Sequence, residues 1–356
     1  MQCLFEVEDP CSGRVWEYAL AWCSWMSKEK GNQMKLVEWL REAEKPWVAP
    51  LMGYPGARMT GTTLQVNVQD AEFHAESILK LHETFSPDCI FPMMDLAVEA
   101  GAMGLPIRFG ENESPTVECH PVKSKEDLRL LEATDAFADK RLASFVETTR
   151  VLRQTIDTAL GTYVTGPFTL AGLMMGATQA AVATLRNPAL LHQVLMFASE
   201  VIIGYAERLE EAGADMIVIL EPTAVMLSPK AFGEFSGRYV ANMVERIGVT
   251  PILHVCGNTT PLIGEMCKTG VEGLSLDAVV DFPGIARTIP SDVALIGNIN
   301  PVSVMASGKP EDVRREVRRL VDGMKPYPNF ILSTGCDLPF ETPIENIRAF
   351  MDEGRT

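Results

Sequence analysis

The chain has 356 residues, of which 47% are hydrophobic and 22% charged, and its formal net charge is −16 at pH 7. This acidic balance argues against nucleic acid or an anionic membrane as a main partner, because both require a basic surface. No apolar run reaches the roughly 18 residues that span a bilayer, and Glu6, Glu8 and Asp9 stand where a secretory leader carries positive charge, so we expect a cytoplasmic protein.

Residues 1–45 precede the first clear strand, and we expect them to form an N-terminal extension. Met34 is an alternative start of the chain within this stretch. The extension also carries three cysteines and an aromatic cluster, Trp16, Tyr18, Trp22 and Trp25. The eight cysteines of the whole chain are too few for a disulfide framework at this length, so we expect metal ligands or buried thiols in a reducing compartment.

Eight short apolar runs then follow one another along the chain. Several are almost continuously hydrophobic, as expected of strands that are buried on both faces of a parallel sheet. The predicted strands are Trp47–Met52, Cys89–Met94, Thr162–Thr165, Met216–Leu220, Ile252–Cys256, Gly273–Leu276, Val293–Ile296 and Phe330–Ser333.

Helical patterns lie between most of these runs, and four of them begin with a capping residue followed by proline at the first helical position. The four starts are Asn187-Pro188, Ser228-Pro229, Thr260-Pro261 and Thr342-Pro343. The first two helices are expected to end near Gly213 and Gly248, and Glu345 completes a capping box in the last.

Strand, loop and capped helix repeat eight times, which predicts a (β/α)8 barrel over residues 46–356. A doubly wound open sheet is the main rival, but no glycine-rich dinucleotide turn follows the first strand. Residues 97–160 are too long for a simple crossover, so we expect an excursion with two helices between the second and third strands.

The carboxyl ends of the barrel strands carry the chemistry of this fold. His254 and Cys256 are two residues apart on an extended strand, so their side chains share a face, and Cys336 follows the eighth strand. One imidazole and two thiols suit Zn²⁺, and three protein ligands leave a fourth position open for catalysis. The alternative is that both cysteines are buried thiols and His254 is a hydrogen-bonded barrel residue.

Other polar residues at the strand ends have less specific interpretations. Asp277 is a candidate catalytic residue, fourth ligand or partner of His254, and Glu221 is a second candidate catalytic residue. Asn258, Asp95 and Asn298 are candidates for binding a cofactor or substrate. Each of these side chains has an alternative structural role as a helix cap or as a partner of loop backbone.

The chain resembles the uroporphyrinogen decarboxylase family, and within it the methylcobamide:coenzyme M methyltransferase branch. In that branch a His-x-Cys pair and a distant Cys bind catalytic zinc, which implies this role for His254, Cys256 and Cys336. The motifs that carry the resemblance are Asp95–Glu99, Gly104–Phe109, Pro115, Thr165–Ala171, His254–Asn258 and Ser333–Pro339.

The resemblance implies a methyl donor or acceptor that is a corrinoid (methylcobalamin) on a separate corrinoid protein. The small partner would be coenzyme M, another thiol, a folate or a methyl donor, depending on the direction of transfer. True decarboxylases carry an Arg-Gln-Ala-Gly-Arg signature, whereas the stretch Gly53–Arg58 has one Arg only. A tetrapyrrole decarboxylase and a non-catalytic corrinoid or tetrapyrrole binder stay as alternatives.

Overall fold

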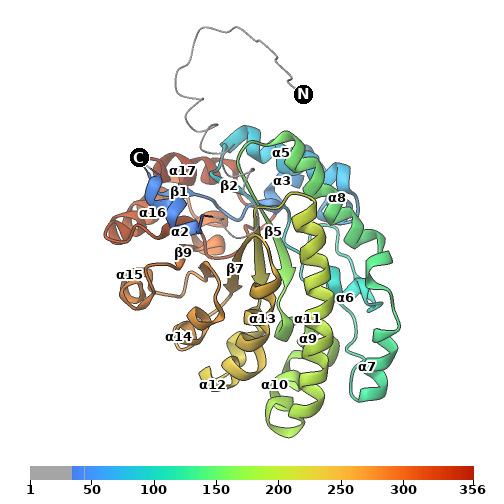
Figure 1. Ribbon diagram of the computed structural model, residues 1–356. Coiled ribbons are helices and arrows are strands. Elements are labelled where there is room, and N and C mark those ends of the chain that lie inside the picture. The colour runs from blue at the N-terminus through green and yellow to red at the C-terminus, as the bar shows by residue number, and fades with distance from the viewer. Residues whose placement is uncertain (1–33, 44) are drawn as a thin grey trace, which may run out of the picture. The chain divides into compact units, whose positions relative to one another are not determined.

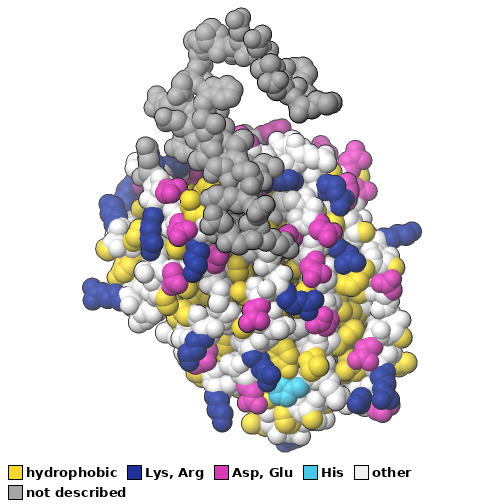
Figure 2. Space-filling view, in the orientation of Figure 1, with side chains coloured by type: hydrophobic (Ala, Val, Ile, Leu, Met, Phe, Trp, Pro, Cys, Tyr) yellow, Lys and Arg dark blue, Asp and Glu magenta, His cyan; other side chains and the backbone are white. Residues whose placement is uncertain are grey.

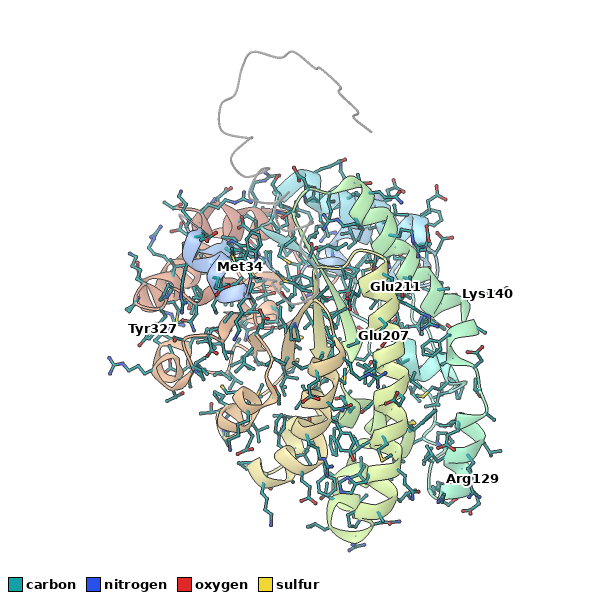
Figure 3. All side chains as sticks on the ribbon, in the orientation of Figure 1. Met34, Arg129, Lys140, Glu207, Glu211 and Tyr327 are labelled. Atoms are coloured by element: carbon teal, nitrogen blue, oxygen red, sulfur yellow. The ribbon has the colours of Figure 1, made fainter. Side chains whose placement is uncertain are left out.

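The computed structural model describes residues 34–43 and 45–356. The aromatic cluster and the three cysteines predicted to lie in the N-terminal extension are outside the described residues. Residues Lys35–Thr356 form one compact unit, and the description below concerns that unit by itself. Side chains fill the space between its central strands and the surrounding helices (Figure 3).

Eight parallel strands form the centre of the unit (Figure 1), and their ladder order is β1-β10-β9-β8-β7-β6-β5-β2. Asp88 connects the two ends of this series, because its N–H donates to Val48 O and its carboxylate accepts from Val48 N–H. The bounds are β1 Trp47–Val48, β2 Cys89–Ile90, β5 Ala159–Thr165, β6 Met216–Leu220, β7 Thr250–Val255, β8 Gly273–Leu276, β9 Ala294–Ile299 and β10 Phe330–Thr334.

Helices follow each strand and cover the outside of the barrel (Figure 1). The predicted (β/α)8 fold is therefore confirmed. The helices after β1 and β2 are α3 Gly53–Thr60, α4 Leu64–Asn67, α5 Ala71–Phe85, α6 Val98–Ala102, α7 Lys125–Glu132 and α8 Lys140–Thr155; those after β5 are α9 Pro167–Met175, α10 Ala177–Arg186 and α11 Pro188–Glu211. The later helices are α12 Pro229–Phe232, α13 Arg238–Arg246, α14 Ile263–Met266, α15 Phe282–Ile285, α16 Pro310–Met324 and α17 Ile344–Gly354.

All eight predicted strands are present, with shifts at their ends. The two largest differences are β1 and β2, which the sequence predicts to be longer than the observed ladders. Pro50 and Pro92 explain both differences, because proline has no N–H to donate to a neighbouring strand.

The predicted helix starts are correct for α11 and α12 and shifted for two others. The Asn187 side chain accepts from Leu190 N–H at the start of α11, and Ser228 caps α12 in the same way. The capping box predicted around Thr342 is wrong: α17 begins at Ile344, and the buried Thr342 hydroxyl has no partner. The helix predicted at Thr260-Pro261 begins later, at Ile263.

Helix α2, Leu36–Glu42, lies within the stretch predicted to be an extension, yet it packs against the barrel. Leu36, Val37 and Leu40 are buried in one cluster with inward-facing strand residues. The Leu36 N–H donates to the carboxylate of Glu272, which immediately precedes β8. The helix therefore closes the barrel interior at the amino ends of the strands, opposite to the end where the chemistry is expected.

The long segment after β2 is the predicted excursion. It contains α6, a two-stranded hairpin of β3 (Ile107–Arg108) and β4 (Thr116–Val117), then α7 and α8. Arg141 on α8 ties this segment to the barrel, because its guanidinium pairs with Asp95 and donates to Ala97 O.

Helix α11 is long and apolar enough to span a bilayer by length and composition. However, 61% of its most apolar stretch is buried inside the protein. Its buried residues include Leu191, Val194 and Ile202, and such burial is what a core helix of a soluble barrel requires. The apolar character of α11 is thus explained by packing.

Candidate metal centre

His254, Cys256 and Cys336 converge at the carboxyl ends of β7 and β10. His254 Nε2 lies 3.0 Å from Cys256 Sγ, and Cys256 Sγ lies 3.4 Å from Cys336 Sγ. All three potential ligand atoms lie within 4.8 Å of one another. Strands β8 and β9 separate β7 from β10 in the ladder, so the closure of the barrel is what brings Cys336 to the other two.

Two glycines allow this close approach. Gly257 has a φ of +87°, a left-handed conformation that side chains rarely adopt. A Cβ on Gly335 would lie 2.5 Å from Ala278 N, so no side chain fits there. Each glycine is next to one of the two cysteines, so the backbone beside both thiols has little room for a side chain.

The sulfurs of Cys256 and Cys336 are hydrogen-bonded to each other. The Cys256 S–H donates to Cys336, which holds the pKa of Cys336 below its usual range and raises the pKa of Cys256. Burial opposes the ionisation of both groups, and the Asp277 charge raises the pKa of Cys256 further. One sulfur is therefore prepared as a thiolate, which is the form that binds a metal ion.

The imidazole of His254 is held from its other side by Ser275. Its Nδ1 lies 2.9 Å from Ser275 Oγ on the neighbouring strand β8. The sequence suggested Asp277 for this place, and the structure corrects that interpretation. The Asp277 carboxylate instead accepts from the N–H groups of Gly257 and Val279, and it is not part of the ligand group in the described residues.

Glu221 lies at the end of β6 and is fully buried. Its carboxylate accepts from Phe168 N–H, Thr169 N–H and the Ser236 hydroxyl, at 2.7 to 2.8 Å. Burial raises the pKa of Glu221, and these hydrogen bonds oppose that effect. The carboxylate thus caps the amino end of α9, and both of its oxygens are engaged.

Among the described residues, no hydrogen bond or ion pair joins the three candidate binding residues to one another, and each has a local partner. Asn258 is exposed, and its side chain accepts from Thr260 N–H. Asp95 is paired with Arg141 and also accepts from Ala97 N–H. Asn298 donates to the carbonyls of Asp277 and Val280. These contacts favour structural roles, and the binding roles stay predictions.

Two residues near the cluster were missed from the sequence. Asp337 follows Cys336 and is half-buried, with its carboxylate accepting from Met94 N–H and Leu338 N–H. Burial raises its pKa, and the Cys336 charge raises it further. The hydroxyl of Tyr54 lies 2.6 Å from Met94 O. The position of Asp337 directly after a ligand was a usable signal, whereas nothing in the local sequence marked Tyr54.

The donor set fits a zinc ion. A tetrahedral site with Zn–S bonds of about 2.3 Å places two sulfurs about 3.8 Å apart, and the sulfurs here are 3.4 Å apart. One nitrogen and two sulfurs leave one tetrahedral position for another ligand, as in catalytic sites. The two sulfurs therefore need to separate only slightly to reach the spacing of a zinc site.

The family model described as uroporphyrinogen decarboxylase (URO-D) matches residues 47–356 of the chain. The methylcobamide:CoM methyltransferase MtbA of Methanosarcina acetivorans is 29% identical over 80% of this chain and 84% of its own length. A uroporphyrinogen decarboxylase of Prochlorococcus marinus is 26% identical over 93% of this chain and 92% of its own length. Both branches of the resemblance are thus represented among the relatives.

Solved structures give the same picture. A methyltransferase from Methanosarcina mazei has a TM-score of 0.82 and 25% identity, and it covers 90% of this chain and 96% of its own. A B12-independent methionine synthase from Shewanella sp. W3-18-1 has a TM-score of 0.53 and 13% identity, which shows likeness of fold alone. These comparisons confirm the resemblance predicted from the motifs.

Proposed function

Because the chain belongs to the uroporphyrinogen decarboxylase family, we propose that it is a zinc-dependent methyltransferase that moves a methyl group between a corrinoid and a thiol or another small acceptor. The zinc ligands are His254, Cys256 and Cys336. The observation that carries this proposal is the convergence of the three ligand atoms within 4.8 Å at the end of the barrel where this fold performs its chemistry.

The chain's own residues supply an electron-rich ligand set. Two thiolates and a neutral imidazole would balance the charge of a divalent cation, and the thiol proton in the Cys256–Cys336 hydrogen bond would be released on metal binding. Bound zinc would lower the pKa of a substrate thiol, so that the nucleophilic thiolate forms near neutral pH.

A corrinoid on a separate protein is the methyl carrier that this proposal requires. The names of the relatives support it, since they are methylcobamide:CoM methyltransferases. We further propose a cytoplasmic location, because the thiols of Cys256 and Cys336 are free and must stay reduced to bind a metal. The catalytic roles of Asp277 and Glu221 stay predictions within this proposal.

The test is a methyl-transfer assay coupled to metal analysis. Wild-type protein should contain about one zinc per chain, as three ligands of this type predict, and should transfer methyl groups between methylcobalamin and at least one thiol of a panel that includes coenzyme M. Cys336→Ala should lose both the zinc and the activity while keeping the circular dichroism spectrum of the wild type.

Cys267→Ala is the matched control, because Cys267 is a partly buried free thiol outside the ligand cluster. It should keep its zinc and its activity. Stoichiometric zinc in the Cys336→Ala protein would contradict the site. Zinc binding without turnover on any thiol would instead favour a non-catalytic corrinoid binder.

A tetrapyrrole decarboxylase is the second candidate, favoured by the decarboxylase relatives that match 93% of the chain. The substrate's carboxylates would need cationic partners, and the stretch that corresponds to the decarboxylase signature supplies one. Arg58, the one arginine of Gly53–Arg58, donates to the carbonyls of Glu341 and Thr342. Decarboxylation of uroporphyrinogen by the zinc-free protein would establish this alternative.

A further inference from the structure

The side of His254 away from the cysteines is occupied by one side chain. His254 and Ser275 are paired across β7 and β8, and His254 Nδ1 lies 2.9 Å from Ser275 Oγ. His254 is 1% exposed and Ser275 is 3% exposed. Water therefore cannot readily replace the serine hydroxyl as the partner of Nδ1.

The two ring nitrogens have different tasks. Nε2 faces Cys256 Sγ at 3.0 Å, so it is the nitrogen that points toward the ligand cluster. A ligating nitrogen carries no hydrogen, so the neutral ring must keep its hydrogen on Nδ1 and needs an acceptor there. The Ser275 hydroxyl is placed to be that acceptor.

We propose that Ser275 is a positioning residue, which fixes both the tautomer and the orientation of His254 for metal binding. This inference rests on the proposed metal site, and it assigns a role that the motif His254-x-Cys256 does not contain. The hydroxyl acts through His254 and does not itself touch the metal or the substrate.

A neutral partner also suits the charge of this site. The ligand set already contains two thiols, and two carboxylates lie close by. The Asp277 charge raises the pKa of Cys256, and the Cys336 charge raises the pKa of Asp337. A carboxylate behind His254 would add another negative charge and disfavour a substrate thiolate. The serine orients the ring without that penalty.

The experiment compares Ser275→Thr with Ser275→Val in the full chain, with zinc alone as the probe. The two side chains have nearly the same shape, and only threonine keeps the hydroxyl. Zinc affinity is measured by competition with a chelator, and the tautomer of His254 by nitrogen NMR. We expect the valine protein to bind zinc about 10- to 100-fold more weakly than the threonine protein, as is typical for loss of such a partner.

Ser333→Ala is the matched control. Ser333 is also a buried strand serine, but its hydroxyl donates to Ala49 O and does not contact the ligand cluster. It should keep wild-type zinc affinity, even if the free energy of unfolding falls.

In the nitrogen NMR measurement, the zinc-loaded Ser275→Thr protein should carry the imidazole hydrogen of His254 on Nδ1 only.

Equal zinc affinity of the threonine and valine proteins would overturn the role of Ser275. A wild-type protein that binds no zinc would contradict the metal centre itself, and this inference would fall with it. Ser275→Ala gives a second comparison with wild type: loss of affinity without a matching loss in the stability of the metal-free protein supports positioning, and unchanged affinity contradicts it.

Discussion

The most unusual single residue outside the metal centre is Glu99, a fully buried carboxylic acid on α6. Its two oxygens accept from the N–H and the hydroxyl of Thr165, at 2.6 and 2.8 Å. Burial raises its pKa from 4.5 to about 7, the hydrogen bonds oppose this rise, and the Asp95 charge adds to it. The folded protein therefore binds this proton more tightly than the unfolded chain does.

The raised pKa predicts a pH dependence of stability. The contribution of Glu99 is fully present below pH 4.5 and is lost as the pH rises toward about 7. The loss is on the order of 3 kcal/mol, since one pKa unit corresponds to about 1.4 kcal/mol. Glu99→Gln should therefore flatten the profile and be more stable than wild type at pH 8, as measured by chemical denaturation between pH 5 and 8.

Asp215 is a second buried carboxyl group that contributes to the same pH dependence of stability. Its pKa is also raised to about 7 by burial, although Arg153 opposes the rise, so part of the decline should persist in Glu99→Gln. A variant profile identical to that of wild type would show that Glu99 titrates normally in the folded protein.

Helix α9 gives Glu221, a candidate catalytic residue, a structural role as a helix cap. Its first turn directs the N–H groups of Phe168 and Thr169 at Glu221, and an anion at a helix amino terminus is favourable. A Cβ on Gly166 would lie 2.5 Å from the same carboxylate. The Thr165-Gly166-Pro167 turn is thus shaped to receive Glu221.

Replacement of Glu221 separates a capping role from a catalytic one. Glu221→Ala should lower the free energy of unfolding by about 2–4 kcal/mol, because it leaves buried donors without a partner. Glu234→Ala, at an exposed glutamate, is the control and should change the free energy of unfolding little. Should Glu221→Gln abolish methyl transfer at unchanged stability, the carboxylate has the chemical role predicted from the sequence.

Helix α2 is the element that closes the barrel at the end away from the metal centre. Leu36 is fully buried and contributes to the same cluster as Ile252, Ala294 and Ile296 from the strands. Its burial inside the barrel means that its loss cannot be repaired by surface rearrangement.

Truncation of Leu36 should therefore be costly. Leu36→Ala is expected to lower the free energy of unfolding by about 2–5 kcal/mol, while zinc binding in the folded protein persists. Leu130→Ala, at a leucine that is 73% exposed, should change it by no more than about 0.5 kcal/mol. Similar small effects for both would show that α2 is dispensable for the barrel.

At the scale of the whole molecule, the net charge of −16 is not concentrated in one patch on the face shown in Figure 2. Basic and acidic side chains are interspersed over that face, and the described residues include exposed ion pairs such as Arg246 with Glu200. Such pairs contribute little to stability. The negative net charge therefore affects which partners the protein can bind more than it affects the stability of the fold.

The sequence by itself predicted the barrel and named the three side chains that the structure brings together as a candidate ligand group. Apolar runs such as Met216–Leu220 and starts such as Asn187-Pro188 are local signals, because strand burial and helix capping depend on neighbouring residues. The His254-x-Cys256 pair shares a face for the same local reason. Only the order of strands around a closed barrel was then needed to place Cys336 on the same rim.

Only the tertiary structure decided which side chains serve those ligands. Ser275, and not Asp277, meets His254, and Glu221 turns toward α9. The side chain across a strand pair or beside a helix end is set by register and closure, which join residues far apart in the chain. No local pattern contains that information, so the three candidate ligands could be named from sequence and the partners of their side chains could not.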